Sequence, residues 1–141
     1  MTCARDAETV GILIAAGADI DAINGQGYGL LKHAAEGGDL AFATALLAAG
    51  ANPDATRTGD TALHAATYQD ELSIMRELLQ RGADANARDV DGWTPLFYAQ
   101  SVEAVRLLRE CGAEPTIEDD VGERARDKIA VRNEEAAAEA G

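Results

Sequence analysis

A glycine followed by alanine and an acidic or amide residue returns four times along this chain, and this recurrence limits the possible folds more than any other feature. The copies are Gly17-Ala18-Asp19, Gly50-Ala51-Asn52, Gly82-Ala83-Asp84 and Gly112-Ala113-Glu114, and their glycines are 33, 32 and 30 residues apart. Apolar residues precede each copy at the spacing of one helical face. A glycine just past the last apolar residue is typical of a left-handed helix C-terminus. The period predicts a stack of small helical units.

A second motif lies between these glycines and predicts where each unit begins. Its copies are Gly59-Asp60-Thr61-Ala62-Leu63-His64-Ala65-Ala66, Gly92-Trp93-Thr94-Pro95-Leu96-Phe97-Tyr98-Ala99 and the weaker Gly27-Tyr28-Gly29-Leu30-Leu31-Lys32-His33-Ala34. Thr94 can cap a helix, and Pro95 at the first helical position loses no hydrogen bond. Each unit is therefore expected to contain a short helix, a tight corner, a second helix and an extended tip.

The two motifs together resemble the ankyrin repeat, which runs Gly-x-Thr-Pro-Leu-His-x-Ala-Ala, then an apolar helix, then Gly-Ala-Asp-x-Asn-Ala. The match covers roughly residues 4–130. The resemblance implies an all-α solenoid of stacked helix-turn-helix units with extended β-turn tips. We expect an ankyrin-repeat domain over residues 1–132 and an acidic, alanine-rich tail over 133–141. The expected units are 1–22 (partial), 23–55, 56–87, 88–117 and a C-terminal cap, 118–132.

The two ends of the chain depart from the repeat pattern. The unit 88–117 lacks three residues near its inter-helix corner, and the first unit has the same short form without a tip or a Thr-Pro start. The first unit is either a degenerate cap or the edge of a longer array. Residues 122–130 follow the first-helix pattern, but charged residues replace the apolar ones. A terminal repeat needs such a polar outer face.

The charge of the chain narrows the class of partner. Lysine and arginine total 12 against 25 aspartate and glutamate residues, which gives a net charge of −13. Phosphate backbones and anionic lipids repel such a chain, so we expect neither nucleic acid nor membrane as partner. A basic protein surface fits better, although acidity could also serve only solubility. Cys3 and Cys111 are too few for a disulfide framework and are expected to be small buried thiols, as in a cytoplasmic protein.

Candidates for catalysis and metal binding are scarce. His64 lies in the Thr-Ala-Leu-His motif, where the resemblance implies a structural histidine bonded to the turn of a neighbouring unit. His33 is one position off that site and is expected on the surface. The cluster Glu118-Asp119-Asp120 lacks the ligand spacing of a calcium loop, and no Cys-x-x-Cys occurs. We predict no catalytic residue, no cofactor and no metal, so the chain is not expected to be an enzyme.

The positions of the aromatic residues point to a binding surface. In the ankyrin family the concave face consists of the turn tips and the first helices. The residues predicted to contact a partner there are Tyr28, His33, Tyr68, Arg88, Trp93 and Tyr98. Tyrosine and tryptophan anchor interfaces because they bring a large area with few rotatable bonds. Alternatively, Tyr28 and Trp93 only cover the neighbouring turn.

The sequence therefore predicts a protein–protein interaction module that binds through its concave face. Two other functions remain open: an acidic inhibitor of a basic enzyme cleft, and a structural segment of a longer multidomain protein. We expect a monomer, with end-to-end association through the incomplete first unit as the alternative.

Overall fold

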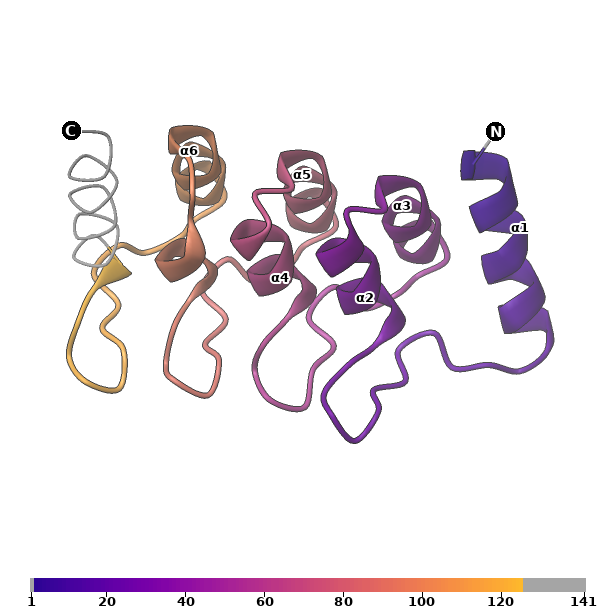
Figure 1. The fold of residues 1–141 in the computed structure, drawn as a ribbon, viewed down its shortest axis with the longest axis horizontal. Coiled ribbons are helices and arrows are strands. Elements are labelled where there is room, and N and C mark those ends of the chain that lie inside the picture. Colours follow the sequence, from indigo (N-terminus) through magenta and orange to yellow (C-terminus); the bar gives the residue numbers. More distant parts are fainter. Residues whose placement is uncertain (1, 126–141) are drawn as a thin grey trace.

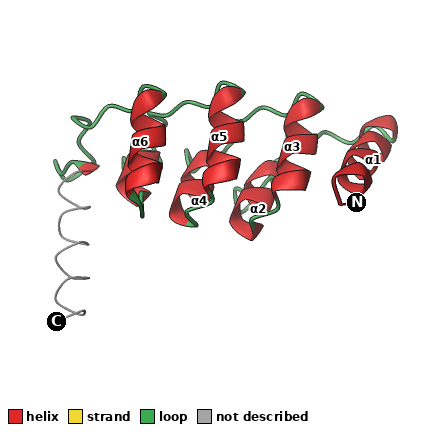
Figure 2. Cartoon of the chain, turned by 90° about the horizontal axis from the view of Figure 1, so that it is seen from above, coloured by secondary structure: helices red, strands yellow, loops and turns green. Residues whose placement is uncertain are grey.

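The computed structural model describes residues 2–125, and it describes side chains from residue 8 onward. The helices are α1 (Thr2–Ala15), α2 (Leu30–Gly37), α3 (Leu40–Ala48), α4 (Ala62–Tyr68), α5 (Leu72–Gln80), the 3-10 helix η1 (Pro95–Tyr98) and α6 (Val102–Glu110). Seen from above, α1, α3, α5 and α6 form one row, and α2 and α4 lie beside it in a second row, to which η1 also belongs (Figure 2). Long loops project from one side of the stack (Figure 1). The described chain is the all-α solenoid that the repeat predicts.

Small and aliphatic side chains build the core of this stack. The largest fully buried ones include Leu46, Leu63, Ile74, Leu78 and Phe97, and many alanines lie between them. Alanine lets neighbouring helices approach closely, so each unit packs against the next as a thin layer. Burial of one leucine side chain contributes roughly 1.5–3 kcal/mol to the free energy of unfolding, and the stack gains this contribution in successive units.

The first helices begin in two different ways. At α4 the Thr61 hydroxyl accepts from the backbone N–H of His64, while the His64 ring accepts from the N–H of Thr61. Thr94 stands at the equivalent position of η1 but makes no side-chain cap bond, so that part of the prediction is wrong. A 3-10 helix winds more tightly than an α-helix, so the N–H of Phe97 already donates to the Thr94 carbonyl at 3.0 Å instead of to the Thr94 hydroxyl.

The three missing residues explain why η1 is short. Helix α4 has 7 residues and η1 has 4, while three residues, 69–71 and 99–101, separate each of them from the next helix. Gln100 and Ser101 lie in the corner after η1, and their side chains bond back to the preceding unit. The Gln100 Nε2 donates to the Tyr68 carbonyl at 2.9 Å, and the Ser101 hydroxyl donates to Asp70 at 2.8 Å. The shortened unit therefore keeps its place in the stack through side-chain bonds.

The extended tips are joined by a ladder of equivalent hydrogen bonds. Asp21 Oδ1 accepts from the N–H of Asn52 at 2.7 Å, and Asp54 Oδ1 accepts from the N–H of Asp84 at 2.9 Å. In the third rung, Asn86 Oδ1 accepts from the N–H of Glu114 at 2.8 Å. Each rung links one unit to the next and fixes the spacing of the tips.

The C-terminal cap is described only in part. Glu118 and Arg124 form an isolated antiparallel bridge and an ion pair at 3.0 Å. The rest of the expected cap, beyond residue 125, and the expected tail over 133–141 lie outside the described residues. Within residues 2–125, the helices are all too short or too polar to cross a membrane.

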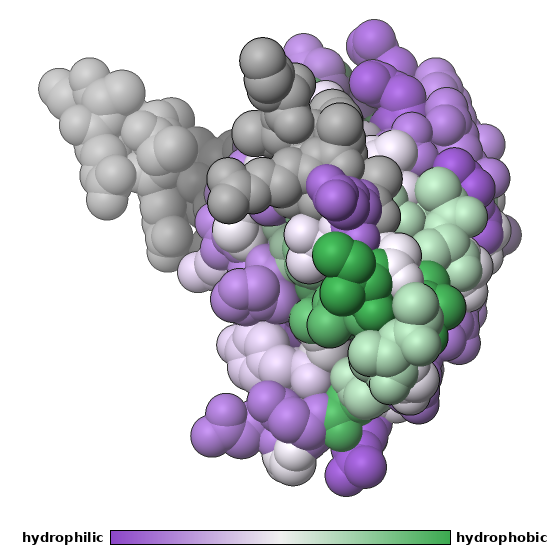
Figure 3. All heavy atoms as spheres, turned by 90° about the vertical axis from the view of Figure 1, so that its right-hand side faces the viewer, coloured by the Kyte–Doolittle hydropathy of each residue, from purple (hydrophilic) through white to green (hydrophobic). Residues whose placement is uncertain are grey.

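The N-terminal end of the stack exposes apolar surface. Helix α1 lies in the row of second helices and packs on α3, and no described helix stands beside α2 in the first row at this end. Among the described side chains of α1 only Val10 is buried, whereas Ile12 is 62% and Ile14 43% exposed. An apolar patch is visible at this end (Figure 3).

This arrangement predicts that α1 is the least stable helix. Its amides should exchange with solvent faster than those of α5, because α5 packs between α3 and α6 while α1 has a neighbour on one side only. Native-state hydrogen exchange by NMR measures this directly. Slower exchange at Val10 than at Leu78 would contradict the prediction.

Candidate functional site

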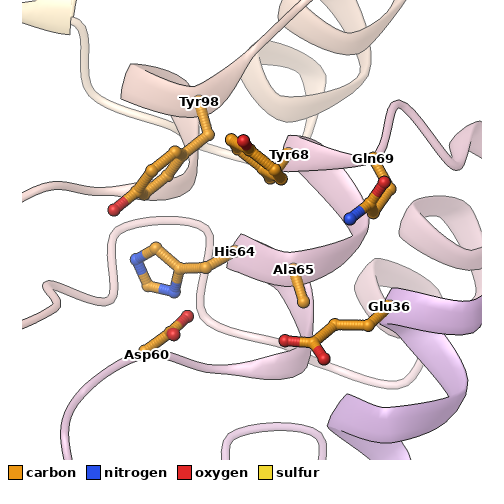
Figure 4. Close-up of a pocket in the computed structure, with 7 residues that line it drawn as sticks. All are labelled: Glu36, Asp60, His64, Ala65, Tyr68, Gln69 and Tyr98. Carbon is orange, nitrogen blue, oxygen red and sulfur yellow. The ribbon is translucent and has the colours of Figure 1, made fainter.

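A hollow of about 380 Å³ lies between α2, α4 and η1. Its lining residues are Glu36, Asp60, His64, Ala65, Tyr68, Gln69 and Tyr98 (Figure 4). Glu36 belongs to α2 and Tyr98 to η1, so three successive units contribute to one site. The stacking of the units thus brings together residues that are far apart in the sequence.

Ala65 explains why there is a hollow at all. Successive copies of the second motif place His33, Ala65 and Tyr98 at the same position. The middle unit carries the smallest of these side chains, and the lining of the hollow includes both Ala65 and the ring of Tyr98. A small residue between two larger ones leaves a depression in an otherwise regular row.

Two tyrosines form the aromatic side of the hollow. The rings of Tyr68 and Tyr98 meet edge to face, with their centroids 6.1 Å apart at 80°. Tyr68 is 57% exposed. The Tyr98 hydroxyl donates to Asp89 Oδ2 at 2.5 Å, which holds the ring in place. Burial, and then this bond to Asp89, raise the pKa of Tyr98 well above its usual value, so its hydroxyl stays protonated at neutral pH.

His64 lies beneath these rings and has a structural role, as the resemblance implies. Its Nδ1 lies 3.1 Å from the backbone nitrogen of Thr61, which can only donate, so Nδ1 accepts and Nε2 carries the proton. Nε2 then donates to the Trp93 carbonyl at 2.9 Å, in the tip of the next unit. Burial lowers the pKa of His64, although the bond to Trp93 opposes this. The ring is neutral at pH 7, and both of its nitrogens are engaged.

The lowered pKa of His64 predicts acid sensitivity in a defined range. The unfolded chain binds a proton near the ordinary value of 6.5, but the folded chain binds it only at lower pH. Stability is therefore fully present above about 6.5 and is lost as the pH falls towards the lowered pKa. Protonated Nδ1 would also face the N–H of Thr61, another donor. Urea unfolding between about pH 7.5 and pH 5.5 should show this loss in the parent and a smaller one in His64→Gln. Equal slopes would contradict the assignment.

Carboxylates form the opposite side of the hollow. Asp60 Oδ2 pairs with Lys32 Nζ at 2.7 Å, and this lysine also lies 4.5 Å from the ring centroid of Tyr28. Glu36 makes no ion pair within residues 8–125. In Figure 4, the side chains of Glu36 and Asp60 lie on one side and the rings of Tyr68 and Tyr98 on the other.

Comparison with known proteins decides the family. The family model described as "Ankyrin repeats (3 copies)" matches residues 1–89 and also residues 31–119. This chain belongs to the ankyrin-repeat family. Ankyrin repeats are generally protein–protein interaction modules rather than enzymes.

Several ankyrin-containing proteins are similar over most of the chain. The mouse B-cell lymphoma 3 protein homolog is 38% identical over 104 residues, which are 72% of this chain and 23% of that protein. The mouse nuclear factor NF-kappa-B p105 subunit is 36% identical over 70% of this chain and 11% of its own length. The E3 ubiquitin-protein ligase KEG of Arabidopsis thaliana is 40% identical over 66% of this chain and 6% of its own length. The chain thus spans a quarter or less of these relatives.

The ankyrin stack groups the residues predicted to bind a partner into three sets. Tyr68 and Tyr98 meet in the hollow described above. Tyr28, which is 39% exposed, and His33 line a second, more open hollow of about 510 Å³ near the first tip. Arg88 and Trp93 lie in the third tip and contact the fourth.

Trp93 is half-buried rather than fully exposed, and its role in binding a partner stays a prediction. Its Nε1 donates to Asp119 Oδ2 at 2.9 Å, and its ring stacks on Phe97 with centroids 5.5 Å apart. The ring covers the neighbouring turn, which was the alternative interpretation of the sequence. Arg88 remains exposed, but its Nη2 donates to the Glu118 carbonyl at 3.0 Å. Both side chains cross to the next tip because the ladder holds successive tips close together.

Sequence reasoning left Lys32 and Gln69 out of the site. Lys32 is 8% exposed and holds Asp60 in place. The signal for it was present, because Lys32 occupies the motif position of His64 and therefore points towards the next unit. Gln69 follows Tyr68 at the C-terminus of α4 and lines the hollow. No motif marks this position.

The cysteines and acidic groups suggest no further chemistry. Cys111 is exposed at the C-terminus of α6, so the expectation of a buried thiol is wrong for it. It directly precedes the turn glycine, where the chain leaves the core. Cys3 belongs to the part of α1 whose side chains are not described. Across the described part of the chain, no three His, Cys, Asp or Glu side chains gather closely enough to hold a metal ion.

Proposed function

We propose that this ankyrin-repeat chain is a non-catalytic module that binds a partner protein through its turn tips and first helices. The observation that carries the proposal is the hollow between α2, α4 and η1, where the exposed ring of Tyr68 stands opposite the carboxylates of Glu36 and Asp60. Large aromatic side chains at the edge of a depression are typical anchors of protein interfaces. Every ring nitrogen of His64 is already bonded, so the imidazole does not serve as a base in this hollow.

The charge supports a partner with a basic surface. The whole chain carries a net charge of −13, and the lining of the hollow includes Glu36 and Asp60, of which Asp60 pairs with Lys32. Complementary charge steers encounter and suppresses the wrong partners. The same charge opposes binding to nucleic acid and to anionic membranes.

The test compares alanine substitutions of two exposed side chains, one that lines the hollow and one that does not. Tyr68→Ala should weaken binding of a partner captured with the parent chain by tenfold or more, since a central aromatic anchor is worth about 2 kcal/mol. Val102→Ala removes a side chain that is 68% exposed at the start of α6, outside the hollow, and should leave affinity unchanged. Calorimetric titration of the captured partner measures both. Equal affinities for Tyr68→Ala and the parent would reject the proposal.

The exposed apolar end of α1 favours a second candidate, a structural segment that stacks end to end. Ile12 and Ile14 are exposed there, and a further unit or a second copy would cover them. Sedimentation velocity distinguishes this candidate. An apparent mass that rises with concentration in the parent but not in Ile12→Lys supports end-to-end association, and a constant monomer mass in both excludes it.

The third candidate, an acidic inhibitor of a basic enzyme cleft, uses the same face as the binding module. It differs in its consequence for the partner. If the captured partner is an enzyme, its activity in the presence of the chain and of Tyr68→Ala separates inhibition from simple binding.

A further inference from the structure

We infer that the hollow between α2, α4 and η1 is a pocket for one arginine side chain of the partner. This deepens the proposed function and rests on it, because it assigns the chemistry of the group that the concave face would recognise.

The shape of the hollow suits a single long side chain. Ala65 forms part of its lining, at the position where His33 and Tyr98 stand in the adjacent units. The volume of about 380 Å³ lies at the lower end of the usual range for ligand pockets, roughly 300–1,000 Å³. Three successive units contribute to the lining, so the pocket exists only in the stacked chain.

The aromatic side of the hollow is suited to a planar cation. Tyr68 and Tyr98 lie edge to face, and Tyr68 is 57% exposed, so its ring is accessible to a group that enters the hollow. The bond from the Tyr98 hydroxyl to Asp89 fixes one ring before any ligand arrives. Guanidinium groups stack on aromatic faces, and a preorganised ring lowers the entropic cost of the contact.

The acidic side supplies the matching charge. Glu36 has no ion-pair partner within the described side chains, and Asp60 uses Oδ2 for Lys32, while its Oδ1 makes no ion pair within residues 8–125. Asp89 adds a negative charge behind Tyr98. The carboxylates outnumber the one lysine, and the nearby imidazole of His64 is neutral at pH 7. A cation is therefore favoured here over an anion or an apolar side chain, which would leave the carboxylates desolvated and unpaired.

Arginine fits this arrangement better than lysine. Its planar fork of N–H donors can bond a carboxylate while its face lies on a ring, whereas the lysine ammonium is a strongly hydrated point charge. The Gln69 side chain, which also lines the hollow, offers an amide oxygen as a further acceptor. A guanidinium can use aromatic, carboxylate and amide groups at the same time.

The first experiment uses N-acetyl-arginine amide as a probe for the 141-residue chain. Its matched controls are N-acetyl-citrulline amide, which has nearly the same shape without charge, and N-acetyl-lysine amide. In titrations followed by amide NMR, the arginine probe should give saturable shifts at Ala65 and Gln69 with an affinity at least fivefold better than that of the lysine probe. The citrulline probe should give none. Equal binding of arginine and citrulline, or no saturable shift with arginine, overturns the inference.

The second experiment uses two variants that change the pocket in different ways. Ala65→Leu fills the hollow and keeps every charge, and Glu36→Gln removes one charge and keeps the shape. Each should weaken the arginine probe at least fivefold, while Val102→Ala should not. Circular dichroism verifies that each variant is folded. Because Glu36 is partly exposed and makes no described ion pair, Glu36→Gln keeps the test valid even if Ala65→Leu fails to fold.

Failure of this inference can be told apart from failure of the proposed function. If Tyr68→Ala weakens the captured partner but the arginine probe does not bind, the module binds proteins without an arginine pocket. If the arginine probe binds in the hollow but Tyr68→Ala leaves the partner affinity unchanged, the pocket exists and the partner uses another surface.

Discussion

Gly59→Ala is expected to lower the free energy of unfolding by about 3–5 kcal/mol, a large effect for one added methyl group. A Cβ built at Gly59 would lie 3.1 Å from the Cα of Asp89 and closer still to the carbonyl oxygen of Arg88. Both atoms belong to the backbone of the next tip, so neither can rotate away. Gly59 also has a φ of +80°, which an alanine adopts only with strain.

Substitution of a second glycine separates the cost of the backbone clash from the cost of the left-handed conformation. Gly82 has a φ of +89°, but a Cβ there would meet no atom within 4 Å. Gly82→Ala should therefore cost only the left-handed conformation, about 1–2 kcal/mol. Urea unfolding followed by circular dichroism gives both values. Similar losses of unfolding free energy at the two positions would show that the third tip moves aside to accommodate the added methyl group.

The second large effect is expected at His64, where replacement by alanine should cost about 3 kcal/mol. The substitution removes the bond from Nε2 to the Trp93 carbonyl and the reciprocal cap with Thr61. It leaves the N–H of Thr61 and the carbonyl of Trp93 without these partners, and it opens space where the ring is 1% exposed. The loss should fall on α4 and on the interface with η1.

His33 provides the matched control. It is exposed and stands one motif position away from the site of His64, in the preceding unit. His33→Ala should change the free energy of unfolding by less than about 0.5 kcal/mol. A comparable loss for both histidines would mean that His64 acts through general helix content and not through its two bonds.

Most of the fold could be predicted from the sequence because each unit repeats the same local structure. The turn glycines, the caps and the apolar faces are specified within single units, and the role of His64 follows from its motif. The form of η1 could not be predicted in this way. The missing residues were visible, but the sequence does not show that they are lost from the first helix itself, which is left with 4 residues and winds as a 3-10 helix.

The candidate site was only partly predictable because it depends on contacts between units. Tyr68 and Tyr98 stood out as aromatics at variable positions, but their meeting requires the correct offset between α4 and η1. The hollow itself arises from a small residue, Ala65, and no pattern of conspicuous residues reveals a missing side chain. The contacts of Trp93 also depend on the stacking of units, since its partner Asp119 lies 26 positions further along the chain.

Because equivalent hydrogen bonds join successive tips, the units of the array are interchangeable. Each rung needs an oxygen on a short side chain at one tip and a free backbone N–H at the next, and the first two rungs use a carboxylate while the third uses the amide of Asn86. The position of the accepting side-chain oxygen therefore matters more than the charge of that side chain. A unit inserted or deleted within the array would meet the same connector on both sides. Such an array can change its length, and with it the span of partner that it covers, without redesign of the units that remain.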